Sequence, residues 1–193
     1  LSAGPTAVTL SATDIYGNVG VCVATVMVID TVPPSIANCP SNLDGCGEAP
    51  AWNPPTTSDN CGIDSLNTAP DINNAFPEGT TTVTYTAVDV SGNTASCQFD
   101  LTIHGLPSAD AGIDDTISAG GNSTLGATPV GSGGTPPYSY IWTPADSLDD
   151  ASTEHPTANP STTTDYHVFV IDDNGCAATV SYTHLTLPTS YPV

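Results

Sequence analysis

Lysine and arginine are absent from this chain of 193 residues, which carries 20 acidic side chains and a formal net charge of −20. Nucleic-acid phosphates are bound mainly through basic side chains, so a nucleic-acid partner is excluded. No apolar run approaches the roughly 20 residues that cross a bilayer as a helix, so we expect no membrane insertion. No segment has helical periodicity of useful length, and 17 Gly and 18 Pro disfavour long helices. The sequence therefore predicts an all-β chain.

Motifs of common catalytic sites are also absent. The sequence has no HExxH, no GxSxG and no P-loop pattern. His155 follows Glu154 in a proline-rich stretch, where adjacent side chains are usually solvated. The glycine-rich run 131–134 is followed by Thr-Pro-Pro, so it predicts a loop and not a phosphate site. We therefore expect a chain that is not an enzyme and needs no cofactor for catalysis.

Aspartate and cysteine are what the chain has in quantity. Seventeen of its acids are Asp and three are Glu, a balance typical of turns more than of helices. Six cysteines without the CxxC spacing of metal sites favour disulfides in an oxidising compartment. We therefore expect the protein to be extracellular or on the cell surface.

An internal repeat organises the first 105 residues. Residues 4–22 (GPTAVTLSATDIYGNVGVC) align with residues 79–97 (GTTTVTYTAVDVSGNTASC) at an offset of 75, with nine of nineteen positions identical. Each copy predicts a strand, a turn and a second strand. The second strand of the later copy alternates apolar with polar residues, which predicts one buried face made by Cys97, Phe99, Leu101 and Ile103. Such a repeat is typical of small antiparallel sandwiches.

A different unit follows residue 105. Its candidate strands are 116–118, 123–126, 138–143, 165–171 and a last one from 177 onward. Asp173-Asn174-Gly175 predicts a type I′ hairpin turn, because Asn-Gly tolerates positive φ. Trp142 lies where a two-sheet sandwich places its central core aromatic. We expect tandem immunoglobulin-like β-sandwiches.

Short motifs follow one another in order between residues 32 and 105. They are Pro33-Pro34-Ser35-Ile36, Cys39-Pro40, Trp52-Asn53-Pro54-Pro55-Thr56, Asp59-Asn60-Cys61-Gly62, Phe76-Pro77-Glu78-Gly79-Thr80-Thr81 and Asp89-Val90-Ser91-Gly92-Asn93. In this order they resemble a complete HYR (hyalin-repeat) domain. Residues 1–31 then resemble the C-terminal half of a truncated preceding copy. Residues 106–179 resemble a PKD-like immunoglobulin-type module with a truncated last strand, on the strength of DAGIDDTISAGG, PPYSYIW and DDNGC.

The resemblance implies a non-catalytic array of modules, a stalk or adhesin segment in a larger secreted or surface bacterial protein. The implied partners are neighbouring repeats of the same chain and a cell-surface glycan or protein ligand. One alternative is a set of accessory, glycan-binding modules of a secreted hydrolase whose catalytic domain lies elsewhere. Another is a filament subunit, if open strand edges in residues 1–31 pair with a second chain.

The cysteines are expected to staple the HYR-like domain. Cys39 and Cys97 lie near its first and last strands, which can be neighbours in a sandwich, so we predict that they pair. Cys46 and Cys61 are predicted to pair across a short loop. Each bridge is worth roughly 3–4 kcal/mol in the loop-closure picture. Two cysteines are expected to be unpaired in the fragment: Cys22, which corresponds to Cys97 in the repeat, and Cys176.

Calcium is the cation that the acidic residues favour. Carboxylates at domain junctions suit Ca²⁺, and the candidates are Asp30 at the first junction and Asp110, Asp114 and Asp115 at the second. The alternative is turn chemistry, which explains Asp89, Asp172 and Asp173 without an ion.

Two roles are open for the aromatic residues. Trp52, Trp142, Tyr138 and Tyr140 offer a platform for sugar stacking, whereas such residues more often fill a sandwich core. The core interpretation is favoured for Trp52 and Trp142.

Both ends of the chain have unusual features. The chain begins at Leu1, and its only methionine is Met27, which indicates a start inside a longer protein. Residues 180–189 (VSYTHLTLPT) resemble the translation of a transposase adapter used in sequencing libraries, and residues 190–193 fit the bases that follow it. We therefore expect residues 180–193 to be adapter-derived, and His184 to have no functional role.

Overall fold

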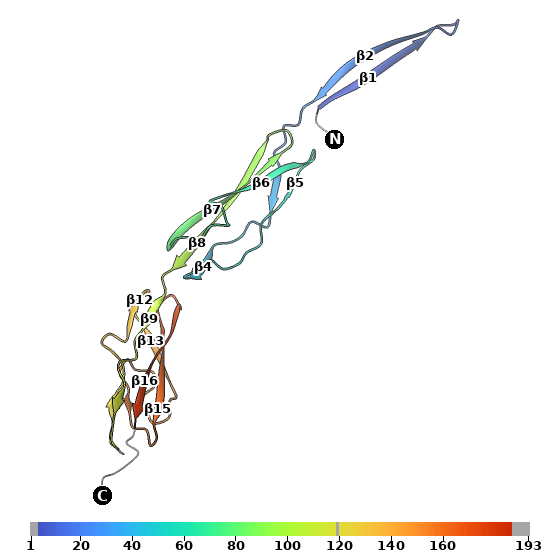
Figure 1. Ribbon diagram of the computed structural model, residues 1–193. Helices are drawn as coiled ribbons and strands as arrows, with labels where there is room; N and C mark the ends of the chain where they lie inside the picture. The colour runs from blue at the N-terminus through green and yellow to red at the C-terminus, as the bar shows by residue number, and fades with distance from the viewer. Residues whose placement is uncertain (1–3, 119, 187–193) are drawn as a thin grey trace. The chain divides into compact units, whose positions relative to one another are not determined.

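The computed structural model describes residues 4–118 and 120–186. Every regular element in that part of the chain is a β-strand, which confirms the all-β class. No helix of the described residues has the length and apolar character needed to cross a bilayer. Two compact units divide the chain, Leu1–Leu43 with Pro50–Thr102 and Asp44–Ala49 with Ile103–Val193 (Figure 1). A short segment from inside residues 32–105 therefore packs with the second unit.

The chain starts with a long hairpin. β1 (Gly4–Thr13) and β2 (Val19–Val28) are antiparallel, in a register from Gly4 opposite Val28 to Thr13 opposite Val19. In the turn, Gly17 donates its N–H to the Asp14 carbonyl at 3.1 Å and has a φ of 84°. Nearly every side chain of the hairpin is exposed, and Leu10 is 70% exposed.

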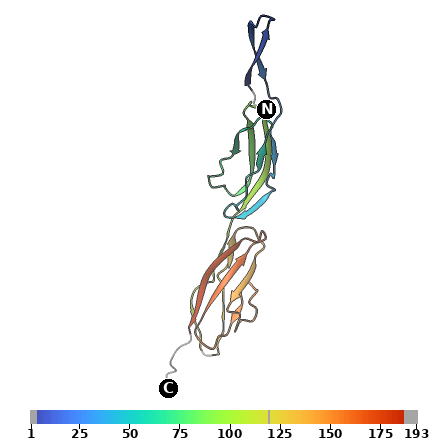
Figure 2. The ribbon, with the colours of Figure 1, turned by 90° about the vertical axis from the view of Figure 1, so that its right-hand side faces the viewer.

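The rest of the first unit is a sandwich of short and long strands. Six strands follow the hairpin in the chain: β3 (Ser35–Ala37), β4 (Leu43–Cys46), β5 (Thr56–Ser58), β6 (Ile63–Ala69), β7 (Gly79–Asp89) and β8 (Thr94–His104). Four of them form a sheet of order β4-β8-β7-β6, and β3 pairs with β5. The part of β4 after Leu43 and the part of β8 after Thr102 belong to the second unit. Figure 2 shows the two longest strands, β7 and β8, side by side in green.

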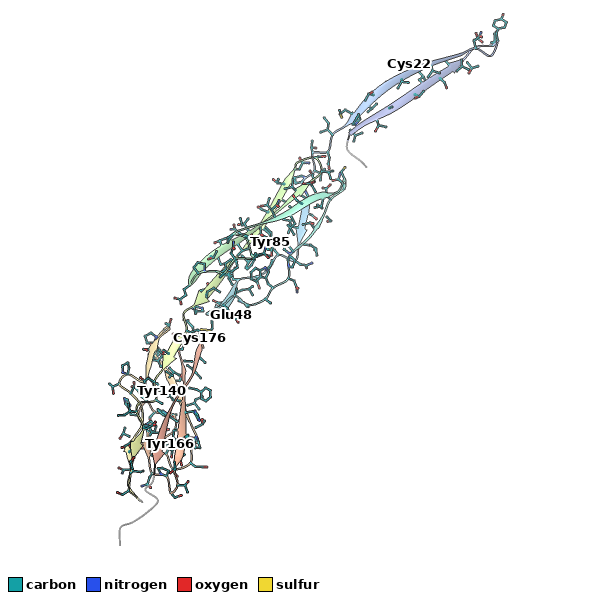
Figure 3. The ribbon with its side chains drawn as sticks, in the orientation of Figure 1. Cys22, Glu48, Tyr85, Tyr140, Tyr166 and Cys176 are labelled. Carbon is teal, nitrogen blue, oxygen red and sulfur yellow. A yellow bond between two sulfur atoms is a disulfide. The ribbon has the colours of Figure 1, made fainter. Side chains whose placement is uncertain are left out.

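Alternation along β7 and β8 builds the core of this sandwich: Phe99, Leu101 and Ile103 are buried as predicted, whereas Cys97 is only partly buried. The buried apolar residues on one face of these two strands are Val83, Tyr85, Ala87, Phe99, Leu101 and Ile103. Tyr85, labelled in Figure 3, is 1% exposed, and its hydroxyl accepts a hydrogen bond from Trp52 Nε1 at 2.9 Å. The polar residues between them face outward, where Thr82 Oγ1 donates to Asp100 at 2.7 Å.

Eight strands follow β8 in the described part of the chain. They are β9 (Pro107–Ala109), β10 (Asp115–Thr116), β11 (Ser123–Thr124), β12 (Gly131–Gly133), β13 (Ser139–Thr143), β14 (Thr157–Ala158), β15 (Thr164–Ile171) and β16 (Ala177–Thr186). The main sheet has the order β10-β16-β15-β13, and the pairs β11–β14 and β12–β9 complete the unit. Its core gathers Ala111, Leu125, Val130, Trp142, Ala158, Tyr166, Val168 and Val170.

Only part of the segment interpreted as adapter-derived, residues 180–193, lies within the described residues. The backbone of residues 180–186 continues β16 beside β15. Residues 187–193, and all side chains from residue 179 onward, His184 included, lie outside the described residues.

Two local expectations for the second unit are wrong. Gly131–Gly133 is a strand and not a loop, and it pairs with β9. Space is tight at this strand, because a Cβ on Gly131 would lie 3.0 Å from Val170 Cγ1 and would require that side chain to shift. The Asp172 turn is not type I′, since Gly175 has a φ of 78° but Asn174 has no positive φ. Gly175 instead donates to the Asp172 carbonyl at 3.0 Å, which makes a three-residue loop ending in a left-handed glycine.

Candidate functional site

Three aspartates that lie about thirty residues apart in the sequence meet at one end of the first sandwich. Asp30 lies between β2 and β3, Asp59 directly follows β5, and Asp89 is the last residue of β7. Each offers one carboxylate oxygen, and these oxygens lie within 4.8 Å of one another. No other trio of His, Cys, Asp or Glu side chains meets this distance in the described part of the chain.

Asp89 organises the turn from β7 to β8. Its Oδ1 accepts the backbone N–H groups of Ser91 and Asn93 at 2.8 Å each, and its Oδ2 accepts the Asn93 side-chain amide at 2.8 Å. Burial raises the pKa of this carboxyl, which is 1% exposed, but the hydrogen bonds together outweigh it and hold the pKa below the ordinary 3.8. Asp89 is therefore a buried carboxylate that stays ionised at neutral pH.

Asp30 reaches the same place from the segment before β3. Its Oδ1 accepts the Val32 N–H at 3.0 Å and the Asn60 side-chain amide at 3.3 Å. Its backbone carbonyl accepts the Asn93 side-chain amide at 3.2 Å. The Val32 hydrogen bond is the main cause that lowers the pKa of Asp30, and it prevails over burial. Asp30 is 7% exposed.

Asp59 completes the cluster through the turn after β5. Its Oδ2 accepts the N–H groups of Cys61 at 2.7 Å and Gly62 at 3.2 Å. Its Oδ1 and the Oδ2 of Asp30 are buried and have no hydrogen-bond partner. Burial raises the pKa of the neighbouring Cys61 thiol, and Asp30 raises it further as hydrogen-bond acceptor and as a negative charge.

This arrangement can hold a hard cation, because all its ligand atoms are oxygens and most of their charge is unbalanced. Sequence reasoning proposed Asp30 but missed Asp59, and it assigned Asp89 to a hairpin turn only. Asp89 makes that turn and also faces the cluster. The signal available in the sequence was that two of the HYR-like motifs, Asp59-Asn60-Cys61 and the Asp89 turn, each begin with an aspartate.

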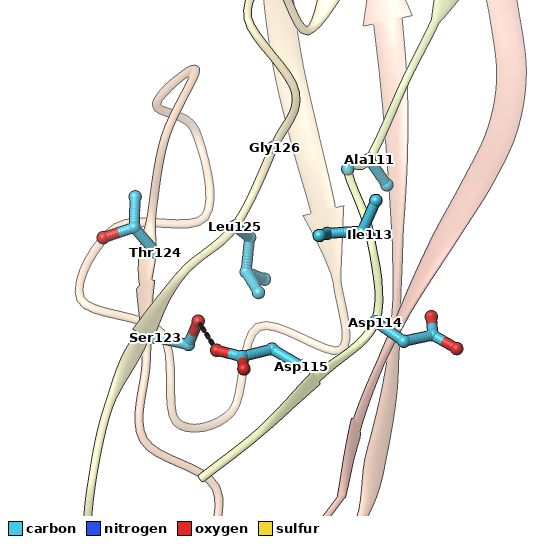
Figure 4. Close-up of a pocket in the computed structure, with 9 residues that line it drawn as sticks. Ala111, Ile113, Asp114, Asp115, Ser123, Thr124, Leu125 and Gly126 are labelled. Atoms are coloured by element: carbon cyan, nitrogen blue, oxygen red, sulfur yellow. Dashed lines mark hydrogen bonds between the residues drawn. The ribbon is translucent and has the colours of Figure 1, made fainter.

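The other predicted calcium ligands do not come together in the same way. Asp110, Asp114 and Asp115 are exposed and form no such trio among the described residues. Asp114 and Asp115 line a pocket of about 200 Å³ with Ser123 and Leu125. Figure 4 shows Asp114 pointing away from Ser123, whereas Asp115 Oδ2 accepts the Ser123 hydroxyl at 2.6 Å.

The structure has two disulfides, and one of them corrects the predicted pairing. Cys39 is bonded to Cys97, with a Cα–Cα distance of 6.2 Å. Cys46 is bonded to Cys176, labelled in Figure 3, and not to Cys61. The reason is that Cys46 belongs to the Asp44–Ala49 segment of the second unit, where Gly47 donates its N–H to the His104 carbonyl at 2.8 Å. Cys176 is thus paired, while Cys22 and Cys61 are free thiols.

Both tryptophans pack inside their units. Trp142 is 1% exposed, and its Nε1 donates to the Thr153 carbonyl at 3.1 Å. Trp52 is partly buried and makes edge-to-face contacts with Phe76 and Phe99, at centroid distances of 6.0 and 5.5 Å. With both indoles used in this way, the sugar-stacking platform expected as an alternative loses its two tryptophans.

Parts of the chain are similar in sequence to known proteins. A 112-residue part of the chain is 38% identical to the rat (Rattus norvegicus) "Sushi, von Willebrand factor type A, EGF and pentraxin domain-containing protein 1", covering 54% of this chain and 3% of that protein. A 138-residue part is 33% identical to hyalin from the sea urchin Strongylocentrotus purpuratus, covering 66% of this chain and 12% of hyalin. The chain thus spans a small fraction of either relative.

The fold comparison gives immunoglobulin-like domains in series. The chain has a TM-score of 0.51 and 13% identity with the N-terminal eight Ig domains of Down Syndrome Cell Adhesion Molecule, over 97% of this chain and 38% of that one. At this identity the likeness concerns the fold alone. The sequence match is more specific: the family described as "HYR domain" matches residues 29–103, which include all three clustered aspartates. Over residues 29–103 this chain is therefore similar to the HYR domain family.

Proposed function

We propose that this chain is a non-catalytic structural segment of an extracellular or cell-surface protein, a stalk or adhesin arm whose modules carry tension. The observation that carries the proposal is the disulfide connectivity, Cys39–Cys97 together with Cys46–Cys176. Disulfides persist in oxidising compartments, which supports an extracellular location. The matches to a HYR domain and to Ig domains in series support a role in building or spacing.

The two disulfides overlap along the chain, and this decides how the chain responds to pulling. The Cys46–Cys176 bond encloses 130 residues, and the Cys39–Cys97 bond encloses 58. A force applied at the two ends passes along residues 39–46 and then through the Cys46–Cys176 bond. The strands between positions 46 and 176 are therefore protected from extension even after their hydrogen bonds break.

Single-molecule pulling of the full chain by its ends tests this role. The oxidised chain is expected to keep residues 46–176 out of the extension. Reduction then adds about 450 Å of contour length, at roughly 3.5 Å for each of those residues. In Cys46→Ala the remaining Cys39–Cys97 bond hides fewer residues, so reduction adds only about 200 Å.

The matched control is Cys22→Ala, which removes a free thiol and should leave the wild-type gain on reduction unchanged. If oxidised wild-type protein extends as far as reduced protein, the chain is not protected by its disulfides and the tension-bearing role is wrong. A wild-type gain equal to that of Cys46→Ala would also contradict it.

Three finer assignments are proposals that accompany this role. The hairpin β1–β2 is the C-terminal half of another HYR repeat, supported by the exposure of Val8 and Leu10 at positions whose repeat counterparts, Val83 and Tyr85, are buried. The second unit is a PKD-like module. Residues 180–193 are adapter-derived, and reading the native gene through this region tests that assignment. The partners we propose are neighbouring modules of the same protein and a surface glycan or protein.

A further inference from the structure

Two carboxylate oxygens of the three-aspartate cluster are buried without a hydrogen-bond partner. Asp30 is more than nine-tenths buried, and its Oδ2 has no hydrogen-bond partner; Asp59 Oδ1 is buried in the same condition. Buried polar atoms in folded proteins almost always have a partner, and a buried carboxylate oxygen left without one is strongly unfavourable. Some group that is not part of the chain therefore belongs at this place.

Charge decides what kind of group it is. Three carboxylates with oxygens within 4.8 Å of one another repel, and the sequence has no lysine or arginine to balance them. A shared proton is the usual remedy for two close carboxylates, but one proton among three carboxylates would still leave two negative charges side by side. A water molecule would satisfy the oxygens without balancing their charge. A cation does both.

The geometry fits an ion of the size of calcium. Ca²⁺ binds six to eight oxygens at about 2.3–2.6 Å, so two of its ligands on opposite sides can be about 5 Å apart. The three oxygens fall within that span. The three carboxylates are already oriented, because a backbone N–H of a turn donates a hydrogen bond to one oxygen of each of Asp30, Asp59 and Asp89. Ca²⁺ also tolerates irregular ligand sets with several waters, which suits a site with three protein side chains.

We propose that Asp30, Asp59 and Asp89 bind one Ca²⁺ ion at this end of the HYR-like domain. The ion joins the segment before β3 to the β5–β6 and β7–β8 turns, and Asn93 already links two of these segments by donating to the Asp30 carbonyl and to Asp89. Calcium therefore fixes where the chain enters the HYR-like domain. This inference does not depend on the tension-bearing role.

The internal repeat supplies a matched control. Asp14 is the counterpart of Asp89 in the hairpin and makes the same bonds: Oδ1 accepts Tyr16 and Asn18 N–H at 2.9 Å each, and Oδ2 accepts the Asn18 amide at 2.8 Å. It is exposed and belongs to no trio of carboxylates among the described residues. Asp14→Asn thus removes the same turn carboxylate without touching the proposed site.

The experiment compares wild type, Asp59→Asn, Asp89→Asn and Asp14→Asn as full chains at constant ionic strength. Equilibrium dialysis with radioactive calcium counts bound ions, and thermal unfolding is recorded in calcium, in magnesium and in chelator. Wild type and Asp14→Asn should bind one tight ion and melt roughly 5 °C or more higher in calcium than in chelator. Asp59→Asn and Asp89→Asn should lose both the ion and the calcium-dependent shift.

Asp59→Asn keeps the test decisive if other variants fold poorly. It keeps the oxygen that accepts the turn N–H groups and removes one repelling charge, so in chelator it should melt at or above the wild-type temperature. Equal calcium binding by wild type and Asp59→Asn would overturn the proposal, because it would mean diffuse screening of the net charge. A magnesium shift as large as the calcium shift would overturn the assignment to calcium.

Discussion

At the scale of single residues, one hydrogen-bonding device recurs through the chain. Eight aspartates accept the backbone N–H of the residue two positions ahead: Asp14, Asp30, Asp59, Asp71, Asp89, Asp110, Asp150 and Asp172. This explains why the acids are mostly Asp, since the shorter side chain reaches its own turn. Three of these turns close hairpins in the same way but end in different surroundings. Asp14 is exposed, Asp89 faces two other carboxylates, and the second oxygen of Asp172 accepts the Thr135 N–H at 2.9 Å.

The Cys61 thiol reports on the cluster beside it. In a Cys22→Ala background, where Cys61 is the free thiol among the described cysteines, we expect alkylation in chelator to follow a pH profile displaced above that of an ordinary thiol, because burial and Asp30 raise the pKa of Cys61. Asp30→Asn removes the charge and should move the profile to lower pH, which speeds the reaction at neutral pH. The rate is measured with iodoacetamide.

Adding Asp14→Asn to the same background is the control and should leave the profile of Cys61 in place. An Asp30→Asn profile that coincides with its parent would show that the carboxylate of Asp30 does not act on the thiol.

Local order was predictable from the sequence, and the meeting of distant residues was not. Alternation and turn residues predicted β13, β15 and the start of β16 to within one residue, because side-chain period and turn chemistry are local, whereas the two-residue strand β14 was not predicted. The pairing of Cys46 with Cys176 was missed, since a segment of six residues packs with the second unit and no sequence pattern marks it. The proximity of Asp59 to Asp30 was also missed. Each of these aspartates accepts a hydrogen bond within its own turn, so the local sequence gives no sign that the two turns meet.

At the scale of elements, the repeat shows that identical strand patterns gain their stability from what covers them. β1–β2 and β7–β8 are copies at an offset of 75. Leu10 in the first is 70% exposed, whereas its counterpart Tyr85 is 1% exposed and holds Trp52. The contribution of each copy to stability therefore depends on the strands packed against it.

Matched substitutions in the two copies test this point. Tyr85→Ala should lower the free energy of unfolding by about 3–5 kcal/mol, because it opens a cavity and leaves the Trp52 donor unpaired. Leu10→Ala should change it by less than about 0.5 kcal/mol. Chemical unfolding followed by tryptophan fluorescence measures both.

Tyr85→Phe should lower the free energy of unfolding by only about 1 kcal/mol, because it keeps the ring and removes the hydroxyl that accepts the Trp52 hydrogen bond. Equal effects of Leu10→Ala and Tyr85→Ala would mean that the hairpin is covered in solution.

At the scale of the whole molecule, the absence of basic residues makes the fold depend on how its carboxylates are held. Hydrogen bonds hold the pKa of eight aspartates below the ordinary 3.8. In Asp14, Asp30, Asp71, Asp89 and Asp150 the donors belong to the aspartate's own turn. In Asp115, Asp149 and Asp172 the leading donors are Ser123, Thr157 and Thr135. Repulsion among the acidic side chains, which give a net charge of −20, opposes this stabilisation of the folded state. The repulsion weakens as the carboxylates take up protons. The two effects have opposite dependence on pH, so the melting temperature can separate them.

We expect the turn hydrogen bonds to decide the acid stability of the protein. A carboxyl whose pKa is lower in the folded state stabilises the fold above its unfolded pKa, and this contribution is lost as pH falls through the folded pKa. The melting temperature in chelator should therefore be nearly constant from pH 7 to about 5 and fall below about pH 4, where these aspartates begin to protonate. Added sodium chloride at pH 7 should raise it by screening the net charge. A melting temperature that rises as pH falls from 5 to 3 would show that the repulsion prevails, and that the aspartate turns stabilise the fold less than their hydrogen bonds indicate.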